Sequence, residues 1–297
     1  MVAVIAGPTA SGKSALALNL AERLGGTIIN ADASQLYADL RVMSARPCAA
    51  DEMRVPHRLY GVLDGNVIAN AASWSAMARA AIAEALATDR LPIIVGGTGL
   101  YLTTLIDGIA PVPEIDAEVR AGVRMLTTGD AAIALAREDA MLAARLHPAD
   151  RQRTLRGLDV VRYSGRSLLA WQAEPVGGIA ADHDARAMVL DVPREGLRAR
   201  VEPRLQAMLA AGALEEVAAL LARRLADDRP VLRALGVAQF AAMLAGTMAE
   251  GAAVAAAATA TRQYQKRQLT WGRSQASNWP RVADAPGAQA LLIRQGC

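Results

Sequence analysis

The residues of this chain with the most recognisable chemistry form a phosphate-binding loop near its first residue. The apolar run 2–6 is followed by the pattern G-x-x-x-x-G-K-[ST], whose members are Gly7, Pro8, Thr9, Ala10, Ser11, Gly12, Lys13 and Ser14. Glycines allow such a loop to curve so that its N–H groups converge on a phosphate chain, and the lysine adds a positive charge. The last hydroxyl is a magnesium ligand in this pattern, so Ser14 is the candidate metal ligand and Mg²⁺ the expected cofactor.

The sequence around the loop supports this interpretation. Apolar residues recur with helical spacing over residues 15–24, and two glycines follow, so strand, loop and helix come in the expected order. The helix then begins near Lys13 and directs its positive end at the same anion. The loop does not identify the reaction, because kinases, NTP-hydrolysing enzymes and some transferases that use a diphosphate share it. Nucleotides such as ATP and organic diphosphates are both candidate ligands.

Two further polar residues follow predicted strands. Asp32 comes after the strand 27–30, and Thr98 follows the strand 91–95 in a glycine-rich turn. The carboxyl ends of parallel strands meet at one edge of a sheet, so we expect both residues in one cleft with the phosphate loop. Asp32 suits three roles, as a general base, a metal ligand or the N-cap of a helix, and its position alone does not choose between them.

Alternating strands and helices must position these residues. Besides the three strands already named, a strand is expected at 185–192 and a helix at 73–87. Short parallel strands joined by helices predict an α/β fold with a doubly wound parallel sheet. Further helices are expected at 194–224, 231–245 and 252–273.

A helical insertion interrupts this pattern. The chain leaves the α/β alternation at a proline-bounded segment, 110–114, and reads as helices without strands until two glycines at 177–178. We therefore expect a P-loop core formed by residues 1–114 and 180–297, and an inserted helical subdomain at 115–179.

Composition limits the class of protein. The chain has 297 residues, of which 53% are hydrophobic and 21% charged, as in a folded globular protein. No targeting leader precedes the first strand, and the apolar stretch 241–261 is interrupted by Glu250, so we expect a cytoplasmic protein without a membrane span. Cys48 and Cys297 are too far apart for a disulfide framework, and the three histidines are too scattered for a metal site.

Local charge is more informative than the net charge of +3. Residues 144–173 contain six arginines and two acids, and residues 261–281 contain five basic residues and no acid. Such clusters suit a phosphate backbone, but a solvated helix face gives the same pattern. On a helix over 262–273, the cations Arg262, Lys266 and Arg273 lie within about 40° of one another. Tyr264 and Trp271 face the other way and are expected to pack into the core.

Several motifs occur in an order that resembles the tRNA dimethylallyltransferase family, over about residues 2 to 275. They are the phosphate loop, residues 32–37 (DASQLY), 96–101 (GGTGLY) and 147–156 (HPADRQRTLR), the pair Arg200 and Arg204, and residues 261–271 (TRQYQKRQLTW). The resemblance implies transfer of a dimethylallyl group from its diphosphate to N6 of the adenine just 3′ of the tRNA anticodon. The phosphate loop then binds a diphosphate leaving group.

The resemblance also assigns roles to residues. Asp32, Thr98 and Arg204 are the implied catalytic residues, with Asp32 as the base that accepts the N6 proton. The helical insertion is expected to bind the anticodon stem-loop of tRNA, and the enzyme is expected to be a monomer. The implied tRNA contacts are Asp32, Ala33, Ser34, Gln35, Thr98, Arg120, Gln152, Arg153, Thr154, Leu155, Arg156, Arg262, Lys266, Arg267 and Arg273.

Three departures from the family pattern leave alternatives open. Ala33 stands where the family usually has Ser, residues 236–239 read GVAQ in place of Gly-Tyr-Arg-Gln, and residues 156–159 read RGLD in place of Arg-Ala-Leu-Glu. A non-catalytic RNA-binding relative would tolerate such losses. A P-loop kinase of small molecules or nucleotides is the other rival, and it would not need the basic helix near the carboxyl end.

Overall fold

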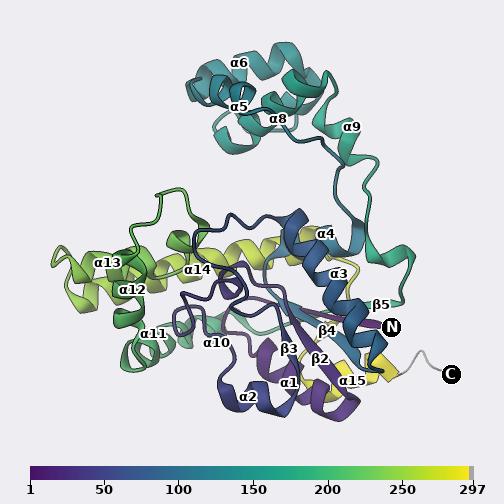
Figure 1. Cartoon of the computed structure of the whole chain (residues 1–297), viewed down its shortest axis with the longest axis vertical. Helices are drawn as coiled ribbons and strands as arrows, with labels where there is room; N and C mark the ends of the chain where they lie inside the picture. Colours follow the sequence, from purple (N-terminus) through teal and green to yellow (C-terminus); the bar gives the residue numbers. More distant parts are fainter. Residues whose placement is uncertain (294–297) are drawn as a thin grey trace. The chain divides into compact units, whose positions relative to one another are not determined.

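The computed structural model describes residues 1–293, so Cys297 lies outside the described residues (Figure 1). The chain divides into two compact units. Unit 1 comprises Met1–Ile106 and the chain from Ile179 onward, and unit 2 comprises Asp107–Gly178. The boundaries expected from the sequence, 114/115 and 179/180, lie a little later than these.

Unit 1 is built on a sheet of six parallel strands. Its order is β3-β2-β4-β1-β5-β6, with all registered pairs parallel. The strands are β1 (Val2–Ala6), β2 (Gly26–Asn30), β3 (His57–Arg58), β4 (Leu91–Gly96), β5 (Ala185–Leu190) and β6 (Arg281–Val282). The chain winds to both sides of β1, which confirms the predicted doubly wound α/β fold. The two-residue strands β3 and β6 were not predicted, because two residues carry no periodicity.

Side chains of β1 point alternately to the two faces of the sheet, and each face has its own core. Ala3 and Ile5 pack in the core that holds α1 (Lys13–Leu24) and α15 (Ala285–Ile293). Val2, Val4 and Ala6 pack in the larger core on the other face. That core holds side chains from α3 (Ala71–Ala87), α4 (Gly99–Asp107), α11 (Val201–Ala210), α12 (Ala213–Ala222), α13 (Val237–Leu244) and α14 (Glu250–Ser274).

The long helix predicted over 194–224 is wrong, because the segment forms three helices. These are α10 (Arg194–Ala199), α11 and α12. Pro203 in the first turn of α11 has no N–H to donate to the preceding helix, and Gly212 ends α11 with a left-handed φ of 96°. In the same way Gly236, with φ of 88°, separates a 3₁₀ turn, η3 (Pro230–Arg233), from α13. Two shorter elements of unit 1 precede the insertion, η1 (Ala33–Leu36) and α2 (Ala49–Arg54), and η2 (Ile179–Ala181) follows it.

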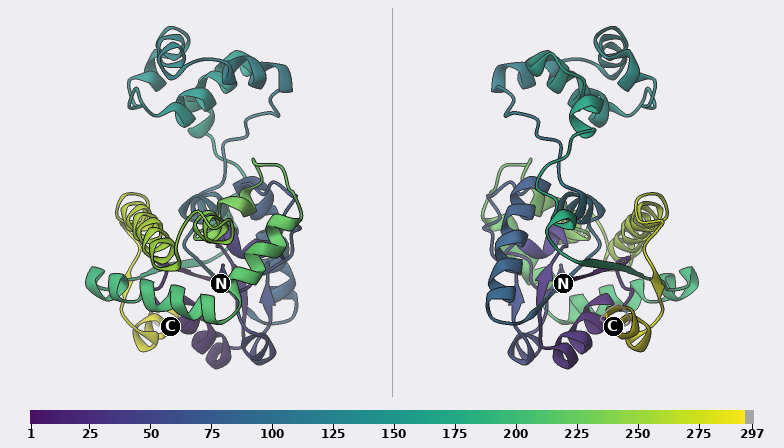
Figure 2. Two further views of the ribbon diagram at one scale, coloured as in Figure 1. Left: turned by 90° about the vertical axis from the view of Figure 1, so that its left-hand side faces the viewer. Right: turned by 90° about the vertical axis from the view of Figure 1, so that its right-hand side faces the viewer.

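Unit 2 is helical throughout its regular elements (Figure 2). Its helices are α5 (Ala117–Arg124), α6 (Thr128–Glu138), α7 (Ala140–Ala143), α8 (Arg151–Ser164) and α9 (Leu168–Gln172). Val123, Leu135, Leu142 and Leu158 form part of a core of its own. Gly157 explains one departure from the family pattern, because a Cβ there would collide with the side chain of Leu142.

Among the described residues, no single helix is both long and apolar enough to cross a membrane; the pair 194–210 and 213–222 passes that test together but is bent by 67°. The described residues also include no cluster of three or more His, Cys, Asp or Glu side chains arranged to hold a metal ion.

Candidate active site

The phosphate loop has the geometry of an anion-binding nest. It connects β1 to α1, and its turn is closed by the N–H of Ser11, which donates to the Pro8 carbonyl at 3.2 Å. Gly12 and Ala10 have left-handed φ values of 94° and 66°. Within the described part of the chain, no acceptor is found for four of the loop's N–H groups, those of Ala10, Gly12, Lys13 and Ser14. Free N–H groups at the start of a helix are the ligands that a phosphate requires.

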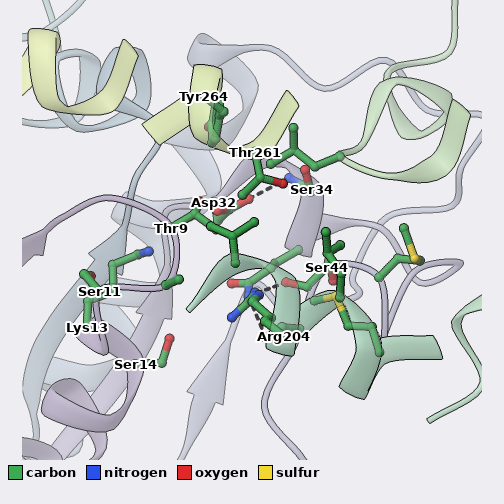
Figure 3. Close-up of a pocket in the computed structure, with 18 of the residues that line it drawn as sticks. Thr9, Ser11, Lys13, Ser14, Asp32, Ser34, Ser44, Arg204, Thr261 and Tyr264 are labelled. Atoms are coloured by element: carbon green, nitrogen blue, oxygen red, sulfur yellow. Dashed lines mark hydrogen bonds between the residues drawn. The ribbon is translucent and has the colours of Figure 1, made fainter. Parts of the chain in front are cut away.

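The loop forms one wall of a cavity in unit 1 (Figure 3). The cavity and its open mouth together span about 1000 Å³. Its polar wall comprises Thr9, Ala10, Ser11, Gly12, Lys13, Ser14, Asp32, Ser34, Gln35, Ser44, Arg204, Thr261 and Tyr264. Its apolar lining comprises Met43, Ala45, Val95, Val201, Leu205, Met208 and Leu235.

Three charged residues from separate elements share this cavity. Lys13 comes from the start of α1, Asp32 follows β2, and Arg204 lies on α11. Burial lowers the pKa of the Lys13 ammonium to about 8; nearby Arg204 lowers it further, and Asp32 opposes both. Burial also lowers the pKa of Arg204, again opposed by Asp32. An anionic group bound beside the two cations would offset the cost of their desolvation and their mutual repulsion.

Asp32 acts as a helix cap with one oxygen. Its Oδ1 accepts the N–H of Ser34 at 3.0 Å, and Asp32 is the N-cap of η1. The buried Asn30 fixes the backbone here, since its Oδ1 accepts the Asp32 N–H at 2.8 Å. For the second oxygen, Oδ2, no hydrogen-bond donor is found within residues 1–293. The capping interpretation is therefore correct, and it leaves one carboxylate oxygen available to a ligand.

Thr98 connects the ends of two strands to α14. Its Oγ1 accepts the N–H of Ala33 at 3.1 Å, and its side chain hydrogen-bonds with the Tyr264 hydroxyl. Because Ala33 takes part through its backbone, replacing a serine by alanine at that position leaves this bond in place. Burial, reinforced by Asp32, raises the pKa of Tyr264 to about 12. The expectation that Tyr264 packs into the core is wrong, because it lines the cavity, whereas Trp271 packs against the larger core.

The apolar side of the cavity is held by an acidic residue that the sequence did not single out. Glu216 on α12 accepts the backbone N–H groups of Val42 and Met43 at 3.0 and 2.8 Å, and also that of Arg41. Gln35 holds the next residues, since its Nε2 donates to the carbonyls of Ser44 and Ala45 at 3.0 and 2.9 Å. These bonds hold the irregular segment 41–45 against the cavity.

Two buried glutamines of α14 were also missed. Gln268 accepts the Thr9 N–H through Oε1 at 2.8 Å, and Gln265 donates to the Thr9 carbonyl through Nε2 at 2.9 Å. The signal that could have found them is a polar stripe, Thr261, Gln265 and Gln268, spaced along one face of an otherwise packed helix. Their partner residue lies more than 250 positions away, at a sequence separation of 256 and 259.

The cations predicted on α14 have different surroundings. Lys266, Arg267 and Arg273 are exposed, and the Arg267 guanidinium lies 5.3 Å from the centre of the Tyr264 ring. Arg262 is half-buried and pairs with Glu202 of α11 at 3.2 Å. The first three therefore form an accessible basic surface on the same helix that lines the cavity.

In unit 2, the predicted RNA contacts lie on α8 and α5. Gln152 and Arg153 are exposed, but the Thr154 hydroxyl is buried and donates to the Asp150 carbonyl at 2.8 Å. Leu155 packs against the unit's core. Arg156 is near enough to Arg120 for that charge to reinforce the lowering of its pKa by burial. Thr154 and Leu155 are thus poorly placed to offer side chains to a ligand.

The parallel sheet, a loop with the P-loop sequence pattern at the end of its β1 strand and the adjoining cavity place this chain in the class of P-loop α/β proteins. The chain belongs to the IPP transferase family, whose model matches residues 35–275. A relative from Sphingopyxis alaskensis named tRNA dimethylallyltransferase is 55% identical over 282 residues, which are 94% of this chain and 92% of the relative. The resemblance inferred from the motifs is confirmed.

Solved structures agree with this assignment. The full-length tRNA isopentenylpyrophosphate transferase from Bacillus halodurans aligns with a TM-score of 0.69 at 28% identity, covering 95% of this chain and 89% of that one. A eukaryotic dimethylallyltransferase acting on tRNA aligns with a TM-score of 0.82 at 24% identity, covering 99% of this chain and 76% of that one, and it supports the fold alone.

Proposed function

We propose that this protein transfers a dimethylallyl group from dimethylallyl diphosphate to N6 of the adenine that is 3′-adjacent to the tRNA anticodon. The observation that carries the proposal is one cavity that combines a phosphate nest, two half-buried cations, a carboxylate and an apolar lining. A prenyl diphosphate has the matching parts, a short apolar chain and a polyanion. The relatives named tRNA dimethylallyltransferase support the choice of substrates.

The leaving diphosphate is where charge develops. The N6 lone pair forms a bond to C1 of the prenyl group as the bond from C1 to the diphosphate oxygen breaks, so negative charge grows on the diphosphate. Lys13, Arg204 and the free N–H groups of the loop stabilise that charge. Asp32 accepts the proton that N6 gives up, through its free Oδ2, and Thr98 helps to orient the adenine across the cleft.

Magnesium fits the residues at the diphosphate end of the cavity. Ser14 places a hydroxyl there, and Ser11 has a buried Oγ without a hydrogen-bond partner. Mg²⁺ commonly keeps several waters and is bound through substrate phosphates together with few protein ligands, which agrees with the missing acidic cluster in the described chain. Ser14 would hold the ion, and the ion would neutralise charge on the leaving group.

The tRNA partner engages both units in this proposal. The basic surface of α14 (Lys266, Arg267 and Arg273) contacts the RNA backbone, and helices α5 and α8 of unit 2 bind the anticodon stem-loop through residues that include Arg120, Gln152, Arg153 and Arg156. The target adenine leaves its stack to reach the cavity. The protein acts as a monomer in the cytoplasm, where tRNA is modified.

The direct test uses undermodified tRNA and dimethylallyl diphosphate labelled in the prenyl carbons. The expected result is label that stays with the RNA and is recovered on the adenine next to the anticodon. Parallel reactions replace dimethylallyl diphosphate with γ-labelled ATP. Label from ATP in any acceptor, with none from the prenyl donor, would identify a kinase; tRNA binding without either transfer would identify a non-catalytic binder.

Removing two cations of α14 should weaken RNA binding by reducing the salt-dependent, electrostatic part of the binding free energy. We expect Lys266→Gln with Arg273→Gln to reduce the slope of log affinity against log salt by about 1.4 to 1.8, since each lost phosphate contact releases one fewer counterion. Arg23→Gln is the matched control, an exposed arginine at the far end of α1. The measurement is tRNA binding at several salt concentrations, and a slope equal to that of the control would separate this surface from the RNA.

A further inference from the structure

Two side chains of α14 form hydrogen bonds to the outer side of the phosphate loop. The Gln268 amide accepts the Thr9 N–H at 2.8 Å and donates to the Gly97 carbonyl at 3.0 Å. The Gln265 amide donates to the Thr9 carbonyl at 2.9 Å. Both glutamines are almost fully buried, with 4% and 7% of their surface exposed for Gln265 and Gln268. Buried amides are costly unless they are satisfied, so these bonds form a fixed connection.

These hydrogen bonds determine the orientation of two peptide groups, Pro8–Thr9 and Thr9–Ala10. In a trans peptide, the carbonyl and the N–H point in opposite directions. With the Thr9 N–H directed at Gln268, the Pro8 carbonyl faces the inner side of the loop, where it accepts the Ser11 N–H at 3.2 Å and the Lys13 ammonium at 3.3 Å. With the Thr9 carbonyl directed at Gln265, the Ala10 N–H faces away from α14, and it has no acceptor within the described residues.

We propose that Gln265 and Gln268 are positioning residues for the diphosphate site. They set the two peptide planes on either side of Thr9, so that the Ala10 N–H is available to the anion and the Pro8 carbonyl tethers Lys13 until the anion replaces it. This rests on the proposed function for the identity of the anion as a diphosphate.

The loop conformation requires stabilisation by residues outside the loop, because the backbone conformation of Ala10 is unfavourable. Ala10 has a φ of 66°, a left-handed conformation that residues with a Cβ adopt only at a cost. Rotation of the Thr9–Ala10 peptide would relieve that cost and turn a carbonyl toward the anion. The contact also leaves no space on its other side, since a Cβ at Gly97 would collide with the Gln268 amide.

The same helix carries the basic surface proposed to bind RNA. Lys266 and Arg267 are exposed and lie in the chain between the buried Gln265 and Gln268, on a single helix of 25 residues. RNA bound to α14 therefore also stabilises the loop, because the two are hydrogen-bonded. An anion that orders the loop in turn stabilises the position of α14 that binds RNA. By linkage, each ligand should raise the affinity for the other.

The test measures binding of inorganic pyrophosphate with Mg²⁺ by titration calorimetry. We expect Gln265→Met and Gln268→Met, which preserve side-chain volume, to bind pyrophosphate about tenfold more weakly, the effect of losing one well-formed hydrogen bond. Affinity for tRNA without pyrophosphate should change less than twofold. Gln263→Met is the matched control, an exposed glutamine on the same helix. Pyrophosphate affinities equal to that of the control would overturn the proposal.

The retained tRNA affinity shows that the variants fold, and a second variant tests the direction of the hydrogen bond. Gln265→Glu keeps the size and polarity of the side chain but presents oxygen to the Thr9 carbonyl, so we expect an even greater loss of pyrophosphate binding. Restored binding in Gln265→Glu would instead assign the methionine effect to packing. In the parent, saturating pyrophosphate should raise tRNA affinity about fivefold, and this gain should vanish in the glutamine variants; no gain in the parent would overturn the link through α14. None of these measurements requires prenyl transfer, so an inactive parent would refute the proposed function and leave this inference standing.

Discussion

Replacing Asp32 by Asn should lower prenyl transfer by about 10² to 10⁴, the range expected for loss of a general base. The carboxylate oxygen Oδ1 caps η1 through Ser34, and an Asn side chain can cap a helix equally well. Only the proton acceptor at Oδ2 is lost. Single-turnover transfer to undermodified tRNA, at saturating dimethylallyl diphosphate, measures the chemical step directly.

The cap can be separated from the base by a second substitution. Asp32→Ala removes both functions, so it should resemble Asp32→Asn in rate and lose about 1 kcal/mol more stability through the missing cap. tRNA binding should change little in either variant. If Asp32→Asn retained the parent's rate while Asp32→Ala lost it, Asp32 would be a structural cap whose effect on catalysis passes through η1.

The positions of the polar residues at the strand ends could be predicted because they depend on local sequence. The phosphate loop, Asp32 and Thr98 each follow a strand whose apolar run is legible, and parallel strands bring their carboxyl ends to one edge. The breaks at Pro203 and Gly212 were harder, since an Ala- and Leu-rich segment has helical periodicity on both sides of them. Short edge strands such as β3 offer no pattern.

The hydrogen bonds that hold the walls of the site could not be predicted from local sequence patterns. Glu216 holds residues 41–43 from α12, at sequence separations of 173 to 175. Gln265 and Gln268 hold Thr9 from still further along the chain, and Tyr264 lines the cavity, where its hydroxyl hydrogen-bonds with Thr98. Each of these contacts depends on tertiary packing, which determines which face of a helix meets the loop. The resemblance included the three α14 residues in a motif without indicating what they touch, and Glu216 belonged to none of its motifs.

The rarity of lysine in this chain draws attention to the role of Lys13 in diphosphate binding. Among its 32 basic residues only Lys13 and Lys266 are lysines. A compact ammonium acts as a point charge on terminal phosphates, and burial brings its pKa closer to neutral pH, whereas a guanidinium stays charged. Lys13→Met should therefore weaken the binding of dimethylallyl diphosphate by about 10- to 100-fold, the effect of losing a charged hydrogen-bond donor. Calorimetric titration measures it, and Lys266→Met is the control that should bind the diphosphate normally.

The lowered pKa of Lys13 gives this variant a second signature. The pKa is about 8 in the folded protein against 10.5 for an ordinary lysine. Between these values the unfolded chain binds more protons, so this group makes the parent more stable as pH rises from about 8 to 10.5. Below pH 8 the charged ammonium is a net cost to the empty site. Lys13→Met should then be more stable than the parent at pH 7, and the difference should shrink above pH 8.

Diphosphate affinity should also depend on pH through the lowered pKa of Lys13. The anion binds the protonated ammonium, so its affinity should be steady below pH 8 and fall above it by up to tenfold per pH unit. Lys13→Met should lose this decline, whereas Lys266→Met should keep it. Since the chain has two lysines, a lysine-selective NMR titration resolves both, and Lys266→Met assigns them. A Lys13 pKa near 10.5 without ligand would show that the ammonium is solvated, and it would remove the basis for both the stability difference and the pH-dependent affinity.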